Sequence, residues 1–363
     1  MKFISRLIFI CFIIFSAPIL AQSKDSTDVS GFSVFGYPYA FYTPETNFAF
    51  GAGGLVYFRT DKIPKLNLSS VLASFYYTIN NQYDITLTPE LYFADNDYIL
   101  KGNFSFGNSI DKFYGVGSAV PEISAPDYLT QYFTVNLNAQ IKISGQLETG
   151  IIYDFFNSKI SDKKENPFLN GKNILGGDGG ISSGLGAKIV YDSRDYIYLP
   201  TSGGYYEISA VFYGNELAGD FNFSDYLVDL RKYFSISDGH LLTFQLYGNF
   251  MTGNPPFYEL PRLGGSTTMR GYYFGRYRDK NYFSAQTEIK NWFWEEFNLG
   301  IVFFAGLGDV AGKFSDFKLT QLQYSYGFGL RYIFDEKERL TVRADFGFGK
   351  NTNGIYFAMQ ESF

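Results

Sequence analysis

The chain has 363 residues, of which 20% are aromatic and 18% charged, together with 38 glycines and a single cysteine. Abundant aromatic residues exclude a disordered chain, and one cysteine excludes a disulfide scaffold. The length alone would allow two soluble domains. The composition favours a single β structure rich in aromatic residues and glycine.

The first 21 residues have the pattern of a secretory signal peptide. Lys2 and Arg6 form a basic start, residues 7–15 are an unbroken apolar run, and small residues lead to a cleavage site after Ala21. Ile19 occupies a position where a small residue is preferred, so the cut could shift by one residue. The apolar core is too short to span a membrane.

Removal of this segment would leave a mature chain without cysteine, because Cys11 lies in the apolar run. Disulfides and thiolate metal sites are then excluded. The mature chain keeps 28 basic residues against 36 acidic ones, a net charge of −8. An acidic chain with no basic stripe is a poor candidate for binding nucleic acid. Residues 22–31 form a short polar lead, which we expect to lie in the periplasm.

No later apolar run approaches the roughly 20 residues that a membrane helix needs. Strict alternation of apolar and polar residues is found instead, for example in 83–93, 242–250, 324–334 and 340–348. These segments run 9 to 11 residues, which is the length of a tilted strand that crosses a bilayer. Strands of a soluble sandwich are commonly about 5–6 residues long.

The two faces of the expected strands differ in chemistry. One face is largely aromatic, whereas the other carries glycine and charge. The charged residues of that second face include Asp229, Arg231, Glu288, Lys290, Arg331, Arg343 and Asp345. A membrane barrel places the aromatic face against lipid and keeps the charges in a wet lumen. We therefore predict an all-β, antiparallel transmembrane barrel over residues 32–363.

Sixteen strands are expected, an even number as in bacterial barrels. Their ranges are 32–43, 47–59, 66–79, 81–93, 97–108, 128–144, 147–158, 181–194, 203–214, 222–235, 240–253, 281–293, 297–308, 321–334, 338–348 and 353–363. With both termini periplasmic, the long connections 109–127, 159–180 and 254–280 fall at the outer end. Phe363 would close the barrel on the aromatic face that holds Phe357.

Four stretches resemble the bacterial surface-antigen barrel family, which includes the BamA and TamA outer-membrane insertases. They span nearly all of the expected mature chain in the family's order. The stretches are YTPET at 42–46 with FGAG at 50–53, YDSRD at 191–195 with PTSG at 200–203, GGSTTMRGY at 264–272, and GFGLR at 327–331 through Asp345 to Phe363. The third stretch is the most specific of the four.

The resemblance implies a 16-stranded barrel whose first and last strands meet at a seam, with loop 254–280 inserted into the lumen. The segment Arg270–Gly271–Tyr272 would lie there, and Arg270 would pair with Glu288 on the following strand as a lock between loop and lumen. The family's next strand usually has a Phe-x-Asp-x-Gly pattern. Here the acid, Asp309, is displaced toward the outer end of its strand, which weakens the case for Asp309 as a partner of Arg270.

Physical chemistry supports such a contact independently. A guanidinium in a narrow lumen needs a carboxylate, preferably a bidentate one. Gly264, Gly265 and Gly271 would let the backbone turn tightly beside the barrel wall. The alternative is that Arg270 is a solvated charge at a loop tip, which would be the better interpretation of an Arg-Gly-Tyr sequence outside this series of motifs.

The amino end departs from the family pattern. Family insertases carry periplasmic POTRA domains that receive substrate, and the lead 22–31 has no room for one. We therefore expect a member without POTRA domains. Such a member would need a partner protein for the missing function, or would have lost it.

Signals for an enzyme are poor. Residues 180–184 (GISSG) match a nucleophile-elbow pattern, but that motif needs a strand–turn–helix context with a nearby histidine. The only histidine, His240, follows Asp238 and Gly239 in an expected turn. No histidine or cysteine cluster indicates a metal site, and no cofactor is expected.

Two further patterns have alternative explanations. The inward-facing basic residues Arg231, Lys290, Arg331 and Arg343 could line an anion pore, but pairing with Glu288, Asp229 and Asp345 across the lumen is the stronger interpretation. The aromatic stripe at 324–328 could be a ligand platform, but a lipid-facing girdle fits better.

The sequence thus indicates an exported, integral outer-membrane barrel that is not an enzyme. The leading hypothesis is a role in outer-membrane protein assembly or translocation, through a weak lateral seam between 32–43 and 353–363. The alternatives are a membrane anchor or platform for a partner protein or a homodimer, and a plugged passive pore. Expected partners are outer-membrane lipid and, under the leading hypothesis, outer-membrane protein substrates or periplasmic proteins. A homo-oligomer remains open.

Overall fold

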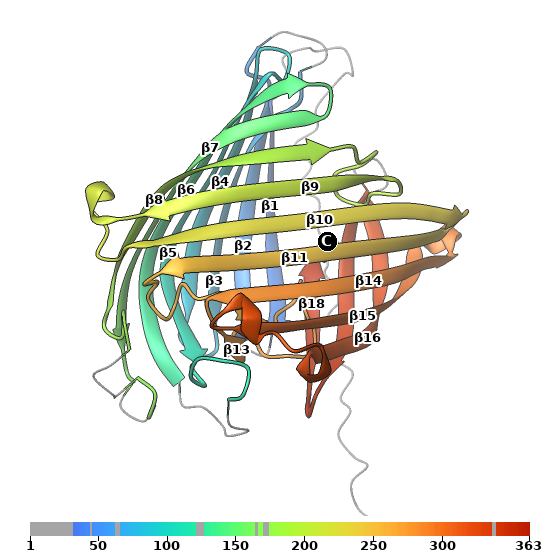
Figure 1. Ribbon diagram of the computed structural model, residues 1–363. Coiled ribbons are helices and arrows are strands. Elements are labelled where there is room, and N and C mark those ends of the chain that lie inside the picture. Colours follow the sequence, from blue (N-terminus) through green and yellow to red (C-terminus); the bar gives the residue numbers. More distant parts are fainter. Residues whose placement is uncertain are drawn as a thin grey trace, which may run out of the picture.

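A computed structural model describes residues 32–43, 46–61, 66–120, 127–163, 166–169, 174–335 and 339–363. The expected signal peptide 1–21 and lead 22–31 lie outside these residues. A single antiparallel sheet of sixteen strands dominates the fold (Figure 1). Its strands are β1 (Ser33–Thr43), β2 (Asn47–Phe58), β3 (Ser69–Thr78), β4 (Tyr83–Phe93), β5 (Tyr98–Lys112), β6 (Asp127–Ser144), β7 (Leu147–Ser161), β8 (Gly179–Asp192), β9 (Gly203–Tyr213), β10 (Phe223–Ser237), β11 (His240–Gly253), β14 (Asn281–Trp294), β15 (Leu299–Ala311), β16 (Gln323–Asp335), β17 (Leu340–Gly349) and β18 (Thr352–Met359).

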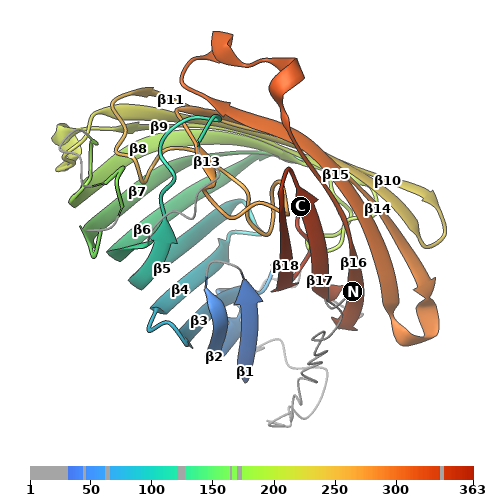
Figure 2. The ribbon, with the colours of Figure 1, turned by 90° about the horizontal axis from the view of Figure 1, so that it is seen from below.

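The sheet follows chain order from β1 to β18 and curls into a nearly closed barrel (Figure 2). The predicted all-β barrel with sixteen strands is confirmed, and each predicted range overlaps one strand of the sheet, with ends that differ by up to four residues. In the described residues no ladder joins β1 to β18, although Cα atoms of the two strands approach within 8 Å. Both edges therefore have backbone groups that no neighbouring strand pairs.

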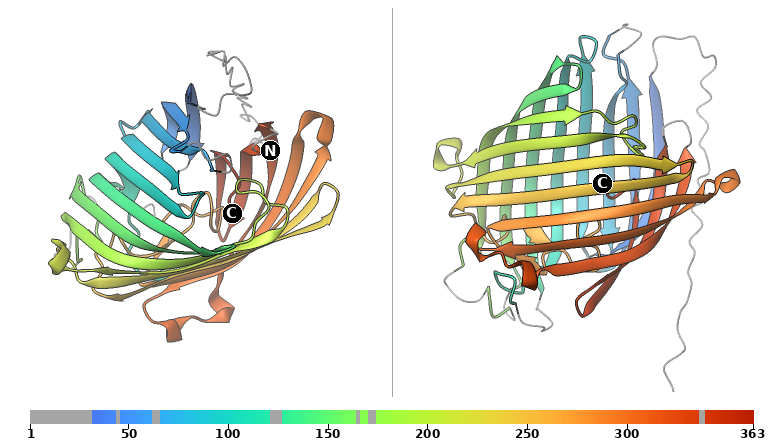
Figure 3. Two further views of the ribbon diagram at one scale, coloured as in Figure 1. Left: turned by 90° about the horizontal axis from the view of Figure 1, so that it is seen from above. Right: turned by 45° about the vertical axis from the view of Figure 1, so that its right-hand side comes forward.

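Period-2 alternation separates the two faces of the wall, because successive side chains of a strand point to opposite sides. In β14, Tyr282, Gln286 and Glu288 are buried on the concave side, whereas Ile289 is exposed on the outside. Exposed apolar side chains such as Phe303 in β15 continue this outer belt around the barrel. Figure 3 shows the same strands from above and from the side.

The connection 254–280 lies on the concave side of the sheet, where Figure 2 shows its β13 label inside the curve of the strands. It contains a two-stranded ribbon, β12 (Arg262–Leu263) with β13 (Tyr277–Arg278). Only short 3-10 helices occur in the described parts of the chain, and none of its helices is long and apolar enough to cross a membrane.

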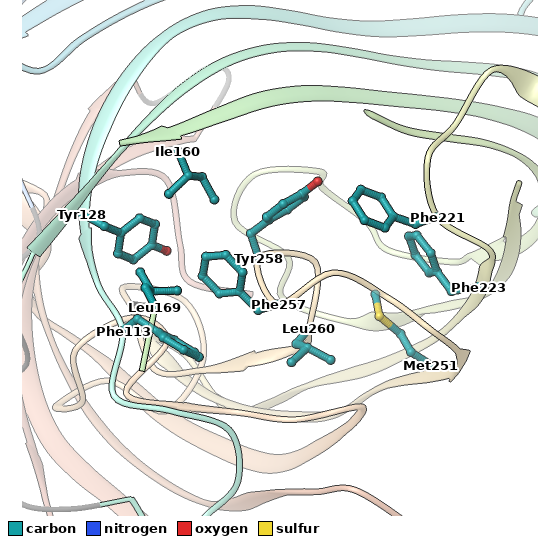
Figure 4. Close-up of a cluster of buried hydrophobic side chains, with 10 residues drawn as sticks. All are labelled: Phe113, Tyr128, Ile160, Leu169, Phe221, Phe223, Met251, Phe257, Tyr258 and Leu260. Carbon is teal, nitrogen blue, oxygen red and sulfur yellow. The ribbon is translucent and has the colours of Figure 1, made fainter. Parts of the chain in front are cut away.

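A cluster of buried apolar side chains, here named the loop aromatic cluster, joins this connection to the strand ends (Figure 4). Its members are Phe113, Tyr128, Ile160, Leu169, Phe221, Phe223, Met251, Phe257, Tyr258 and Leu260. The ring of Phe257 lies 4.8 Å from that of Phe113 and 5.6 Å from that of Tyr128. The cluster therefore holds the first half of loop 254–280 against β6, β10 and β11.

The carboxyl end differs from the prediction of one strand over 353–363. β18 ends at Met359, because Gln360 takes a left-handed conformation with φ of 67° and its N–H donates to the Thr341 carbonyl at 2.7 Å. The residues after this kink leave the outer face. Phe363 is only 4% exposed, whereas Phe357 of β18 is 46% exposed. The expectation that Phe363 continues the aromatic face of β18 is therefore wrong.

Candidate functional site

The best-defined polar site lies where the second half of loop 254–280 meets β14, β16, β17 and the carboxyl-terminal tail 360–363. Arg270 is 1% exposed and forms ion pairs with Glu288 and Asp345, its Nη1 lying 2.7 Å from Asp345 Oδ2. Its guanidinium also stacks 3.7 Å from the ring centroid of Phe304. The fork and planar shape of arginine suit both contacts, which a lysine could not reproduce together.

Arg270 belongs to a continuous network of buried charges, here named the Arg270 cluster. Its members are Arg270, Glu288, Lys290, Arg331, Arg343, Asp345 and Glu361. Asp345 is the centre, since it pairs with three arginines: Arg270, Arg331 and Arg343. Four cations face three carboxylates, so each carboxylate is compensated and no acid in the network is left as an isolated buried charge.

Glycine allows the loop to approach the wall closely enough for these contacts. Gly271 has φ of +110°, and a Cβ there would lie 2.6 Å from the carbonyl carbon of Phe348. On the other side, a Cβ at Gly347 of β17 would lie 2.6 Å from the Gly271 nitrogen. Any larger residue at either position would push the two backbones apart and pull Arg270 away from Asp345.

Tyrosine hydroxyls fix the backbone next to Arg270. The Gly271 N–H donates to Tyr356 Oη at 3.0 Å, and Tyr356 Oη donates to the Tyr272 carbonyl at 3.1 Å. Tyr272 Oη donates to the Tyr324 carbonyl at 2.9 Å. The loop is thereby attached to β16 and β18 as well as to the charged residues of β14 and β17.

The carboxyl-terminal tail, which follows the kink at Gln360, completes the site. Glu361 lies 2.8 Å from Lys290 Nζ and 3.0 Å from Arg331 Nε, and Ser362 donates to Glu288 Oε1 at 2.6 Å. Burial disfavours the charged carboxylate, but Arg331 and Lys290 outweigh it and lower the pKa of Glu361. The tail is thus bound to the same charges that hold the loop.

Other residues that the sequence singled out are placed as follows. Gly264 and Gly265 have φ of 108° and 103° in the turn before Arg270. Among the described residues, the ion pairs of Arg270 join it to Glu288 and Asp345 and not to Asp309. Asp309 is buried near the end of β15, where its carboxylate accepts the N–H of Val310 at 2.9 Å.

The inward-facing charges are paired within one strand or between neighbouring strands, rather than across the lumen as the sequence suggested. Arg231 pairs with Asp229, Lys290 with Glu288, and Arg331 and Arg343 with Asp345. The sequence did not identify Glu361 and Ser362 as part of the site. Their position depends on the kink at Gln360, for which the strand pattern contains no signal.

The weak enzyme signals find no supporting geometry. Ser182 of the GISSG segment is buried inside β8, with no helix following it. His240 is exposed at the start of β11, where its Nδ1 lies 2.9 Å from the Asp238 carbonyl oxygen. In the part of the chain that the structure describes, no three His, Cys, Asp or Glu side chains are grouped to hold a metal ion.

Solved structures with the same fold come from bacterial outer-membrane proteins. BamA from Haemophilus ducreyi, lacking POTRA domains 1–3, matches with a TM-score of 0.62 and 12% identity over 91% of this chain and 70% of that chain. CdiB from Escherichia coli matches with a TM-score of 0.59 and 10% identity over 90% of this chain. CdiB from Acinetobacter baumannii matches with a TM-score of 0.56 and 15% identity over 91% of this chain.

The chain spans only 62% and 59% of the length of the two CdiB chains. At these identities the likeness shows the fold alone. No curated protein sequence matches the chain. A family model, however, covers residues 65–363 and is described as the Omp85 superfamily domain. It includes the loop 254–280, the Arg270 cluster and the tail. The chain belongs to the Omp85 superfamily of outer-membrane barrels.

Proposed function

We propose that this barrel acts in outer-membrane protein assembly or translocation through the seam between β1 and β18. The observation that supports it best is that no ladder pairs the two strands in the described residues, although they lie next to each other. Unpaired N–H and C=O groups at such edges can pair with an incoming strand. The seam therefore offers a site for β-augmentation by an unfolded outer-membrane protein.

In this proposal the loop 254–280 is seated in the lumen, and Arg270 with Glu288 and Asp345 holds it there. The same cluster contacts the tail that follows β18 through Glu361 and Ser362. Movement of β18 at the seam would consequently strain the contacts of the loop. Arg270, Gly271 and Tyr272 thus have a structural and gating role, and no chemical step is assigned to them.

A reconstituted assay tests the proposal. Vesicles that contain the barrel are mixed with a urea-unfolded eight-stranded outer-membrane protein, whose insertion is followed by its heat-modifiable gel mobility. We expect faster insertion than into empty vesicles. Disulfides between cysteines placed in β1 and β18 should abolish the gain. The only natural cysteine is Cys11, so the introduced thiols can be oxidised selectively in the processed protein.

The matched control is a disulfide between two strands that are already paired, with cysteines at Ser209 and Leu227, which face each other across β9 and β10. This crosslink should leave insertion unchanged. Insertion that is no faster than into empty vesicles, or that is equally fast with the seam crosslinked, would contradict the proposal. A barrel that serves only as a platform for a partner would give the first result.

A further inference from the structure

The connection between β15 and β16, residues 312–322, stands out from the convex side of the wall. In Figure 2 it is the orange loop that projects beyond β15, and Figure 3 shows the same projection from above. It contains two short 3-10 helices, Phe314–Asp316 and Leu319–Gln321. This loop is here named the outer flap, and it makes none of the contacts of the Arg270 cluster.

The outer flap packs its rings onto the outward-facing rings of the wall. Phe314 lies 6.0 Å from Phe250 of β11, and Phe317 lies 4.8 Å from Phe283 of β14, measured between ring centroids. Phe250 and Phe283 point outward, because their sequence neighbours Met251 and Tyr282 are buried on the inner side. The flap is therefore an extension of the exposed apolar belt of the barrel.

Two apolar side chains of the flap remain without cover. Leu319 is 85% exposed and Phe314 73% exposed, the two highest values among the large apolar side chains of the described residues. Exposure of both side chains to water would be unfavourable in free energy. The wall beneath them belongs to a lipid-facing surface in an outer-membrane barrel, so acyl chains lie within reach of both.

Basic residues flank the apolar ones. Lys313 and Lys318 are exposed on either side of Phe317, and the only acid of the flap is Asp316. Lysine side chains beside an apolar surface extend their ammonium groups toward the headgroup region. The combination of apolar rings, a leucine and flanking lysines is typical of segments that lie in a membrane interface.

We propose that the outer flap binds the membrane surface at its end of the barrel, with Phe314 and Leu319 among the acyl chains and Lys313 and Lys318 at lipid phosphate groups. The occupant is lipid rather than a protein, because the flap is continuous with the apolar belt and its charge is complementary to anionic headgroups. The flap would fix the depth and tilt of the β11–β16 wall in the bilayer.

Depth-dependent fluorescence quenching tests this. The chain has two tryptophans, Trp292 and Trp294, both at the end of β14. After Trp292→Phe and Trp294→Phe, Leu319→Trp provides a single reporter in the refolded full-length barrel. In vesicles of phosphatidylcholine and phosphatidylglycerol, bromines near the glycerol end of the acyl chains should quench it several-fold more than bromines near the methyl end.

Glu216→Trp in the same background is the control, since Glu216 is exposed in a short 3-10 helix of another loop at the same end of the barrel. It should show little bromine quenching. Equal quenching at 216 and 319 would overturn the proposal. Lys313→Gln with Lys318→Gln should reduce the effect of adding phosphatidylglycerol, and an unchanged effect would refute the assignment of the lysines to phosphate.

A second readout distinguishes lipid from a protein occupant. Leu319→Cys should react slowly with a water-soluble maleimide both in vesicles and in native membranes. Fast reaction in vesicles with protection only in native membranes would indicate a protein occupant and would overturn the proposal. Heat-modifiable gel mobility verifies that every variant is folded.

Discussion

The two halves of loop 254–280 are held by different kinds of interaction. The first half places Phe257, Tyr258 and Leu260 in the loop aromatic cluster, whereas the second half places Arg270 among buried charges. Burial of apolar surface is non-directional, so neighbouring apolar side chains can adjust to a change. Buried ion pairs depend on every partner, because loss of one leaves an uncompensated charge. The second half should therefore be the more sensitive to substitution.

The largest effect is expected from Asp345→Asn. Asp345 compensates three arginines, and its neutralisation leaves four cations against two carboxylates in a buried site. Removing one partner from a buried ion pair typically costs about 3–5 kcal/mol of stability. The melting temperature in detergent, followed by heat-modifiable mobility, should fall steeply.

Asp309→Asn is the control for this prediction, because Asp309 is also a buried carboxylate, but it lies opposite the outward-facing Phe283 and has no ion pair among the described residues. It should change the melting temperature little. Equal effects of the two substitutions would show that burial of the carboxyl group, rather than its pairing, determines stability here.

Arg270→Ala should have a smaller effect, about 3 kcal/mol, because Lys290 still compensates Glu288 and two arginines still compensate Asp345. The loss should be local. Hydrogen exchange should increase at 266–274 and stay unchanged at 256–261, and conductance in planar bilayers should rise. Arg270→Lys keeps the charge but not the fork or the stacking on Phe304, so it should restore only part of the protection.

Phe257→Ala affects the other half of the loop. It removes a buried ring that touches Phe113 and Tyr128, a change that typically costs about 3 kcal/mol or more in a rigid core. Here the surrounding rings can partly close the gap, so we expect a smaller loss than for Arg270→Ala. Exchange should increase at 256–261 only. Combination with Arg270→Ala should be additive within about 0.5 kcal/mol, and strong coupling would mean that the loop moves as one unit.

Much of the fold follows from local pattern. The strand period of two is visible in segments such as 242–250, and it predicts both the sixteen strands and the face on which Glu288 and Asp345 lie. The contact of Arg270 with Asp345 on β17 was not predicted from the sequence. It depends on how far the loop reaches across the sheet, a long-range property that spacing along the chain does not encode.

The tail shows how periodicity can mislead. Continued alternation from Phe357 places Glu361 and Phe363 on the outer face, where a carboxylate would meet lipid. A single left-handed residue, Gln360, ends the strand alternation, and Glu361 lies next to Lys290. Glutamine is not a usual signal for that conformation, so the kink, and with it a third of the carboxylates in the Arg270 cluster, could not be predicted from the pattern.

The smallest expected effects come from a change of pH. A rise in pH should stabilise the contacts of the Arg270 cluster and destabilise those of the loop aromatic cluster. Arg331 and Lys290 lower the pKa of Glu361 against the effect of burial, so its contribution to stability is present above its ordinary pKa of 4.5 and is lost as the pH falls below it. Burial, with Asp154 nearby, raises the pKa of Glu259 to about 7. Glu259 lies between Tyr258 and Leu260, so the aromatic half loses stability as the pH rises from 4.5 to about 7.

Hydrogen exchange at several pH values separates the two effects, after correction for the intrinsic exchange rate. Protection at 266–274 should fall on acidification, and Glu361→Gln should lower it already at neutral pH and flatten its acid dependence. Protection at 256–261 should fall between pH 5 and pH 7, and Glu259→Gln should remove that fall because its amide stays neutral. The same pH dependence in both halves would mean that one cooperative unit holds the loop, and the distinction between ionic and aromatic attachment would then have no consequence for its opening.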